Sequence, residues 1–279
     1  MTAPPWQDVP PPRGASWSLG GGLRVVLRGL ALAVLVFGCL LLLLLVRLVE
    51  RPLFGLDRPI TPHITRFVCR NALRILGMGF QAEGTPMQAR GAGVANHGSW
   101  LDIFALNARQ CVYFVAKVEV SGWAGIGWLA RATGTVFIAR DRRQAAAQRQ
   151  LFRDRLAAGH HLMFFPEGTS TDAQRVLPFK PTLFAAFFDA NSAEAPLAIQ
   201  PVSVIYTAPE GADPRFYGWW GEMAFAPHLL QVLAVRRHGA VRVIYHDPLP
   251  IADYPDRKAL ARAAEARVRA GVETAQTRR

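Results

Sequence analysis

The sequence has few cysteines, and none of them stands in a metal-binding pattern. Its 279 residues contain only Cys39, Cys69 and Cys111, and no two of them have C-x-x-C spacing. The seven histidines show no H-E-x-x-H pattern. Zinc sites and disulfide frameworks need closely spaced ligands of this kind. The sequence therefore predicts neither a metal site nor a disulfide framework.

Lysine is also scarce, although the chain is strongly basic. Lys117, Lys180 and Lys258 are the only lysines, and the other 29 of the 32 basic residues are arginines, against 20 acidic residues. The net charge of +12 suits nucleic acid, an anionic membrane surface or an anionic substrate. No helix-turn-helix, zinc-finger or RNP-type pattern accompanies this charge, so we expect no nucleic-acid partner.

Charge is absent from one long stretch near the N-terminus. Residues 1–22 are rich in proline and end in three glycines, a composition that predicts disorder. Residues 29–46 then carry no charged side chain. As a helix with a rise of about 1.5 Å per residue, this run reaches roughly 27 Å, which is just enough to cross the hydrocarbon layer. We predict a membrane anchor over residues 23–50.

A cleaved signal peptide would begin in a similar way, because Arg24 and Arg28 precede the apolar run. The run is long for a signal peptide, however, and RLVERPLFG follows it in place of a small-residue cleavage site. Arg47 and Arg51 follow the run, so the positive-inside rule gives no orientation. An uncleaved anchor is favoured, and the sequence leaves open whether it crosses the bilayer or re-enters it.

A basic stretch follows the anchor. Arg66, Arg70 and Arg74 recur at intervals of four within ITRFVCRNALRILGMGF, which predicts a basic amphipathic helix. Such a helix fits an ordinary protein surface and an anionic membrane interface equally well. The two tryptophans of WWGEMAF, residues 219–225, raise a similar choice, and here a place in the core is slightly favoured over a membrane interface.

From about residue 90 onward, short apolar runs alternate with helical stretches. The predicted strands are residues 91–96, 111–117, 134–139, 161–166, 199–206 and 241–246. The predicted helices lie near residues 100–109, 142–158, 180–190 and 256–270. This alternation predicts an α/β or α+β domain with functional loops at strand ends. We assign residues 51–255 to this domain, and residues 256–279 to a solvated C-terminal helix and tail.

The segment NHGSWLD, residues 96–102, follows one predicted strand and opens a predicted helix. Asp102 lies five positions after His97, about one helical turn away, and can curl back to the imidazole. A carboxylate on one ring nitrogen fixes the tautomer and leaves the other nitrogen able to take a proton. His97 and Asp102 are therefore candidates for a general base and the residue that orients it.

Two further segments place polar residues at strand ends, and a third is a strand that contains Pro-Val, although each is weak evidence by itself. FPEGTS, residues 165–170, closes a strand with a turn whose amides and hydroxyls suit a polar head group. GTVFIAR delivers Arg140 to a strand end, where a guanidinium can clamp phosphate or carboxylate. Pro201 and Val202 lie within the strand IQPVSVIY.

In this order the four segments resemble the lysophospholipid acyltransferase family, which includes the 1-acylglycerol-3-phosphate acyltransferases. That family has an N-H-x-x-x-x-D box, a G-x-x-F-I-x-R strand, an F-P-E-G-T turn and a late Pro-Val strand, and the resemblance covers roughly residues 65–250. It implies a mixed-sheet, glycerolipid-acyltransferase-like domain behind an N-terminal membrane helix. It also implies transfer of a fatty acyl group from acyl-carrier protein or acyl-CoA to the free hydroxyl of a lysolipid.

The resemblance implies a role for each matching residue. His97 would take the proton of the acceptor hydroxyl as it attacks the thioester, and Asp102 would orient His97. The residues implied to hold the acceptor head group are Arg140, Glu167, Gly168 and Thr169, and we add Ser170 and Lys180 as candidates beside them. No cofactor, metal or acyl-enzyme is expected, and the sequence contains no G-x-S-x-G elbow.

One position departs from the family pattern. Phosphate-accepting members commonly carry F-P-E-G-T-R, whereas this sequence has Ser170, followed by Thr171 and Asp172. The missing guanidinium removes a bidentate phosphate partner, and Asp172 adds a charge that repels phosphate and attracts an amine. The string FPEGTSTDAQRVLPFKPTLFAAFF looks like the lyso-ornithine-lipid acyltransferase branch. Arg175 or Lys180 would then meet the carboxylate of an ornithine head group.

Two other classes of function compete with this interpretation. A non-catalytic membrane adaptor would hold anionic lipid with its basic face, and would not need the pair of His97 and Asp102. A lipid hydrolase would need an activated water or nucleophile with its partners, which the sequence does not show. We favour an enzyme of a bacterial inner membrane with its catalytic domain in the cytoplasm, where the acyl donor is available.

Overall fold

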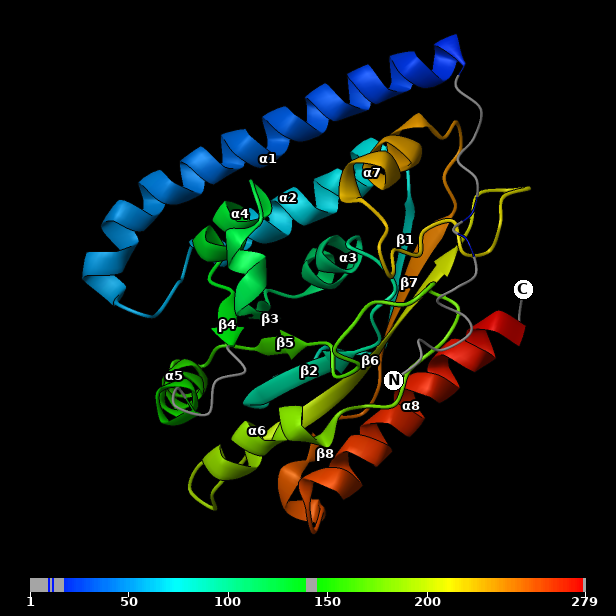
Figure 1. Ribbon diagram of the computed structural model, residues 1–279. Coiled ribbons are helices and arrows are strands. Elements are labelled where there is room, and N and C mark those ends of the chain that lie inside the picture. The colour runs from blue at the N-terminus through cyan, green and yellow to red at the C-terminus, as the bar shows by residue number, and fades with distance from the viewer. Residues whose placement is uncertain (1–9, 11, 13–17, 139–144, 278–279) are drawn as a thin grey trace.

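The computed structural model describes residues 10, 12, 18–138 and 145–277 of the chain (Figure 1). Most of the segment predicted to be disordered lies outside this part, and so does Arg140, the predicted head-group clamp. The described residues form a mixed β-sheet with helices on both faces and one long helix across the outside. The predicted α/β class with a mixed sheet and an N-terminal helix is confirmed.

The sheet contains eight strands within the described residues, in the order β1-β7-β6-β2-β5-β3-β4, with β8 paired to β6. The strands are β1 (Gly79–Glu83), β2 (Gly91–Ala95), β3 (Tyr113–Lys117), β4 (Val136–Ile138), β5 (Leu162–Phe164), β6 (Ala198–Thr207), β7 (Ala240–Tyr245) and β8 (Leu249–Pro250). From β6 to β4 neighbouring strands are parallel, whereas β7 and β8 are antiparallel to β6. The carboxyl ends of the parallel strands therefore meet at one edge, where open α/β sheets bind ligands.

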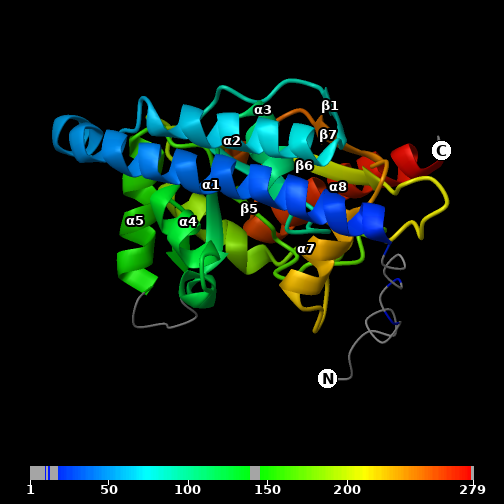
Figure 2. The same cartoon turned by 90° about the horizontal axis from the view of Figure 1, so that it is seen from above.

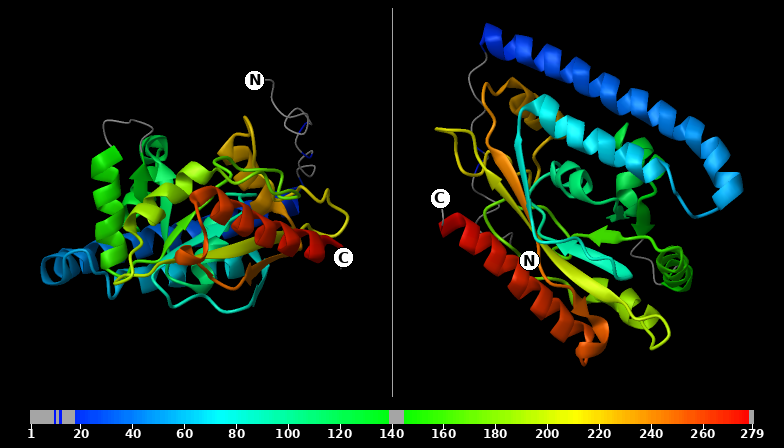
Figure 3. Two further views of the ribbon diagram at one scale, coloured as in Figure 1. Left: turned by 90° about the horizontal axis from the view of Figure 1, so that it is seen from below. Right: turned by 180° about the vertical axis from the view of Figure 1, so that it is seen from behind.

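Helices cover both faces of the sheet and enclose two hydrophobic cores (Figure 3). The first core includes residues of α2 (Thr61–Leu76), α3 (Asp102–Arg109) and α7 (Phe225–Ala234). The second includes residues of α5 (Ala145–Ala157), α6 (Ala185–Ala190) and α8 (Arg257–Thr277). The parallel strands β2, β4 and β5 are short and carry no polar side chain, because both faces of the sheet are covered in this way.

The C-terminal helix α8 is longer and more buried than its alternating charges predict. Leu260, Ala264 and Val268 are buried against the sheet, so only the outer face of the helix is solvated. The approach is close, because a Cβ added at Gly271 would lie 2.4 Å from Ser203 Oγ. The prediction of a solvated helix holds for the outer face alone, because short alanine side chains form an apolar stripe that is easily overlooked between arginines.

The long helix α1 (Leu19–Phe54) contains the apolar run and starts four residues before the predicted anchor. Its length and composition are sufficient to cross a membrane. At about 1.5 Å per residue it extends roughly 54 Å, well beyond the hydrocarbon thickness of about 30 Å. Figures 1 and 2 show that it runs lengthwise along the domain, where it contacts α2, α4 (Ile126–Ala132) and α7. Its outward face is a row of exposed apolar side chains, including Leu30, Val34, Phe37, Leu41 and Leu45.

The N-terminal part of α1 is bound to the end of α7. Arg24 Nε donates a hydrogen bond to the carbonyl of Ala234 at 2.7 Å, and Arg28 Nη1 donates to the carbonyl of Leu233 at 3.0 Å. The last carbonyls of a helix lack partners within the helix and carry partial negative charge, so cations bind them well. The two arginines that resemble the charged start of a signal peptide thus fix α1 to the catalytic domain.

The C-terminal part of α1 is bound to the start of α2. The buried carboxylate of Glu50 accepts hydrogen bonds from the backbone amides of Ile60 at 2.8 Å and Thr61 at 3.1 Å. It also accepts the Thr61 hydroxyl at 2.7 Å. These amides belong to the unpaired first turn of α2, which a carboxylate stabilises. Both ends of α1 are therefore attached to the same domain.

The basic helix predicted from Arg66, Arg70 and Arg74 is α2. Its end is fixed by Gly77, which adopts a φ of +76°. Arg70 and Arg74 are exposed, whereas Leu73 and Leu76 on another side of the helix are buried in the first core. The predicted amphipathic helix is confirmed, and its contact with an anionic membrane stays a prediction.

Candidate active site

His97 lies in the loop after β2, at the edge where the parallel strands end. Its Nδ1 is 2.7 Å from Oδ2 of Asp102, the first residue of α3, as the spacing of the two residues predicts. The same oxygen accepts the backbone amides of Gly98 at 3.0 Å and Ser99 at 3.1 Å. A carboxylate with these donors is an acceptor only, so Nδ1 carries the proton and Nε2 keeps a lone pair. The imidazole is thus in the tautomer that a general base needs.

Tyr206, near the end of β6, is a further member of this site that the sequence analysis missed. Its hydroxyl donates to Oδ1 of Asp102 at 2.6 Å. Burial raises the pKa of Tyr206 well above its usual value of 10, so the hydroxyl keeps its proton. Asp102 is itself fully buried. Both of its carboxylate oxygens accept hydrogen bonds, and these stabilise its negative charge. The sequence signal that could have identified Tyr206 is a side chain with a hydroxyl group within the Pro-Val strand.

Two residues of the box set the path of the His97 loop. The side-chain amide of Asn96 donates to the carbonyl of Val204, and its side-chain oxygen accepts the Val204 amide, each at 2.8 Å. These are the two hydrogen bonds that a backbone partner in a neighbouring strand would make. Gly98 allows a close approach, because a Cβ at this position would lie 2.8 Å from the Cβ of Ala173. The loop is therefore attached to β6 on one side and to the segment after β5 on the other.

The FPEGTS segment supports His97 directly. The ring of Phe165 stacks on the imidazole with centroids 4.0 Å apart, and the His97 side chain remains 20% exposed. Thr171 donates its backbone amide to the carbonyl of His97 at 2.8 Å and its hydroxyl to the same oxygen at 3.1 Å. Two motifs more than sixty residues apart in the sequence form one unit in the structure.

Glu167 has a different environment from the one that the head-group role implies. It is buried, with Oε1 accepting the backbone amide of His97 at 2.8 Å and Oε2 accepting that of Leu177 at 2.9 Å. Both carboxylate oxygens are thus hydrogen-bonded to the protein backbone. Burial outweighs these two donors and raises the pKa of Glu167 to about 8. Its contacts are those of a residue that positions the catalytic loop.

Of the other predicted head-group residues, those that the structure describes lie at the turn after Glu167. Gly168 has a φ of +73°, and a Cβ there would lie 2.5 Å from Nζ of Lys180, whose side chain therefore passes over the turn. The backbone amide of Lys180 also donates to the carbonyl of Pro166 at 2.9 Å. Thr169 is exposed and Ser170 is partly exposed beside it. An ammonium group and two hydroxyls thus meet at one turn.

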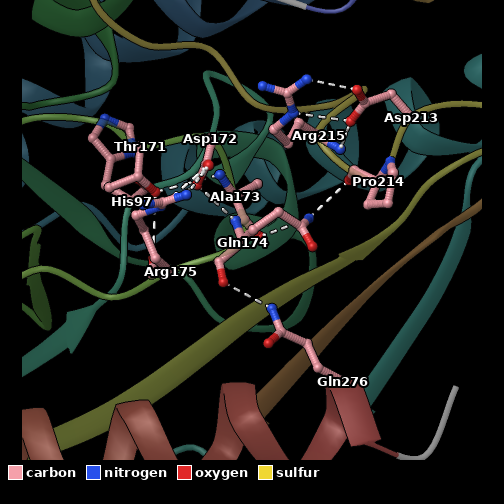
Figure 4. Close-up of polar contacts among 10 residues, drawn as sticks. All are labelled: His97, Thr171, Asp172, Ala173, Gln174, Arg175, Asp213, Pro214, Arg215 and Gln276. Carbon is pink, nitrogen blue, oxygen red and sulfur yellow. Dashed lines mark hydrogen bonds and ion pairs between the residues drawn. The ribbon is translucent and has the colours of Figure 1, made fainter. Parts of the chain in front are cut away.

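Asp172 is engaged within the protein, contrary to the expectation that it attracts an amine of the acceptor. Its side chain is only 2% exposed, and it accepts hydrogen bonds from Arg175 Nε at 3.0 Å and Nη2 at 2.8 Å (Figure 4). The backbone amide of Gln174 donates to it as well, at 3.1 Å. This expectation was wrong because the chain turns sharply at Ala173, with a φ of +62°, and brings the arginine back to the aspartate.

We predict that Glu167 makes stability fall as the pH rises. A group with a folded pKa of about 8 keeps a proton that the unfolded chain releases near pH 4.5, so its stabilising contribution is complete below 4.5 and is lost towards 8. The slope from this group is at most about 1.4 kcal/mol per pH unit. Glu167→Gln, which cannot titrate, should remove that slope in thermal unfolding between pH 5 and 8.

The exposed Glu210 provides a matched control, since Glu210→Gln changes the same charge away from this loop. If the unfolding temperatures of wild type and Glu167→Gln fall in parallel across this pH range, Glu167 is ionised in the folded protein and the prediction is wrong.

Comparison with known proteins agrees with this geometry. The family model described as Acyltransferase matches residues 81–205, which include the described site residues above except Tyr206. A lyso-ornithine lipid O-acyltransferase of Rhodobacter capsulatus is 57% identical over 98% of both chains, and one of Brucella abortus is 39% identical over 79% of this chain and 84% of its own. A 1-acyl-sn-glycerol-3-phosphate acyltransferase of Neisseria meningitidis is 30% identical over 73% and 78%.

The fold has also been seen in a solved structure. The crystal structure of the 1-acyl-sn-glycerophosphate acyltransferase of Thermotoga maritima matches with a TM-score of 0.62 and 21% identity, over 92% of this chain and 96% of that one. At this level of identity the match establishes the architecture alone. The Rhodobacter capsulatus relative extends along nearly the whole chain, and on that evidence the chain belongs to the acyltransferase family, as an enzyme of lipid biosynthesis.

Proposed function

We propose that the enzyme transfers a fatty acyl group from a thioester donor, acyl-carrier protein or acyl-CoA, to the free hydroxyl of lyso-ornithine lipid. The observation that supports this most is the imidazole of His97, which is held in one tautomer by a buried Asp102 beside a turn that carries Lys180. The relatives named lyso-ornithine lipid O-acyltransferases support the choice of acceptor. A non-catalytic adaptor would not need a histidine positioned in this way.

In the proposed reaction, His97 acts through Nε2. The acceptor hydroxyl donates its hydrogen bond to Nε2, which takes the proton as the oxygen attacks the thioester carbonyl. Asp102 stabilises the imidazolium that forms. When the tetrahedral intermediate collapses, the carbon–sulfur bond breaks, the ester remains on the lipid, and the departing thiolate takes the proton from Nε2. A positioned base of this kind contributes about a hundred- to ten-thousand-fold to the rate.

The head group is proposed to bind at the turn of Gly168, Thr169 and Ser170. Lys180 lies over this turn and supplies one positive charge, which suits the single carboxylate of an ornithine head group. A phosphate dianion would gain more from a bidentate guanidinium at position 170, where this chain has a serine. Arg140, outside the described residues, is proposed as a further partner. Because Asp172 is occupied by Arg175, we do not assign it to the amine.

We predict that the purified enzyme acylates lyso-ornithine lipid at least as fast as lysophosphatidate when both compete for a labelled donor. Ser170→Arg should shift this preference towards lysophosphatidate by about one decade, since a charge-assisted hydrogen bond contributes about 1.5–3 kcal/mol. Ser170→Ala serves as the control, because it removes the hydroxyl without adding charge. A strong wild-type preference for lysophosphatidate that Ser170→Arg leaves unchanged would contradict the proposal.

The same contacts support a position for the enzyme on the membrane. Arg24 and Glu50 attach opposite ends of α1 to one domain, so a helix that crossed the bilayer would place these attachments on opposite sides. We therefore propose that α1 lies within one leaflet, with its exposed apolar face in the lipid. The proposed leaflet is the cytoplasmic one of the inner membrane, where thioester donors are available.

We predict that the residues before and after α1 are accessible from the same side of the membrane. In a variant without native cysteines, Gln7→Cys and Asp57→Cys should both react with an impermeant maleimide in inverted inner-membrane vesicles and remain unlabelled in spheroplasts. Glu210→Cys, in the exposed part of the catalytic domain, marks the side of the domain. Labelling of Gln7→Cys and Asp57→Cys from opposite sides would show that α1 spans the bilayer.

A further inference from the structure

A row of aromatic rings leads from the catalytic loop to the surface. Trp100, three positions after His97, packs edge-on against Phe225, with ring centroids 5.4 Å apart. Phe225 packs against Trp219 at 6.4 Å, and Trp219 packs against Trp123 at 6.2 Å, both again edge-on. These four rings come from the segments after β2, β3 and β6. We call them the aromatic row.

Hydrogen bonds fix the inner end of the aromatic row. Trp100 Nε1 donates to Nδ1 of His228 on α7 at 2.8 Å. Burial lowers the pKa of His228, so its ring is neutral and Nε2 donates to the carbonyl of Phe216 at 3.2 Å. Trp219 donates its backbone amide to the carbonyl of Gly98 at 2.9 Å. The row is therefore attached to the loop that carries His97.

The outer end of the row is exposed and remains apolar. Trp123 is 44% exposed, and Trp128, five positions later on α4, is 64% exposed. Indole rings of this kind are typical of membrane interfaces, where an apolar ring with one polar N–H lies at the level of the lipid head groups. Of the two adjacent tryptophans considered in the sequence, Trp220 is in the core as favoured, and Trp219 belongs to the row.

The exposed end of the row continues the apolar surface of α1. Helices α4 and α7 both contact α1, and Figure 2 shows them along the same flank of it. α4 carries Trp128, and α7 carries Leu230, which is exposed as well. The segment with Trp123 and Trp128, and the helix α7, thus both lie next to α1.

We propose that the segment carrying Trp123 and Trp128 is a second membrane contact, which inserts into the interfacial layer of the leaflet that holds α1. This contact brings the entrance of the His97 site to the lipid surface, so that a lysolipid reaches the base while its acyl chain stays in the bilayer. The inference rests on the proposed function, because only a lipid acceptor requires such a position. A bilayer is favoured over a protein partner because the patch adjoins the apolar face of α1.

The first test measures where residue 128 lies, without using activity. In a full-length variant without native cysteines, Trp128→Cys is labelled with an environment-sensitive fluorophore and mixed with vesicles of phosphatidylethanolamine, phosphatidylglycerol and lyso-ornithine lipid. We expect a blue-shifted emission that a spin-labelled lipid quenches and aqueous iodide does not. The same label at Leu151→Cys, a 38% exposed position on α5, should remain accessible to iodide.

The second test compares rates in two lipid environments. Trp128→Ser should lower the ratio of the acyl-transfer rate in vesicles to that in detergent micelles by about tenfold, whereas Leu151→Ser should leave the ratio unchanged. The proposal would be overturned if the label at position 128 stays in water. It would also be overturned if the label is shielded only as the protein concentration rises, a result that would indicate contact with a second copy of the chain. An absence of acyl transfer by wild type in micelles would contradict the proposed function and would not affect the fluorescence result.

Discussion

The buried carboxylate of Asp102 is the interaction on which the active site depends. It receives the His97 imidazole, two backbone amides and the Tyr206 hydroxyl, so its charge is balanced by donors from the loop and from β6. A buried charge without such partners would cost several kcal/mol. The backbone must therefore follow one path around Asp102, and that path aims Nε2 of His97 outward. Glu167 and Thr171 hold the same loop from the segment after β5.

The proposed position of the enzyme on a membrane rests on polar contacts. Arg24 and Arg28 hold α7, Glu50 holds α2, and between these attachments α1 turns an apolar face outward. α7 also carries His228, which orients Trp100 three positions after His97. The helix proposed to contact lipid and the loop that carries the proposed base are thus joined through one short helix.

Sequence patterns predicted the hydrogen bond between His97 and Asp102, but they did not predict the partners of Tyr206 and Asp172. The spacing of His97 and Asp102 predicted their hydrogen bond because five positions across a helix start leave few alternatives. Tyr206 was missed because its partner is about a hundred residues away and appears only when β6 lies beside β2. Asp172 was misjudged because its pairing with Arg175 depends on the left-handed turn at Ala173, which no local propensity indicates. Six of the eight described strands were found from apolar runs. β1 was missed because its first residues end the stretch that was assigned to the basic helix, and the two-residue β8 offers too short a pattern.

The most direct test is the turnover rate of His97→Ala and Asp102→Asn in detergent micelles, with both substrates saturating and the fold checked by thermal unfolding. Asparagine keeps the shape of Asp102 but presents no charge to the imidazole, so the base loses both its tautomer and its counter-charge. The account predicts that both variants fold and that each loses at least about a hundredfold in turnover. Acyl transfer by either variant at more than about a tenth of the wild-type rate would contradict it.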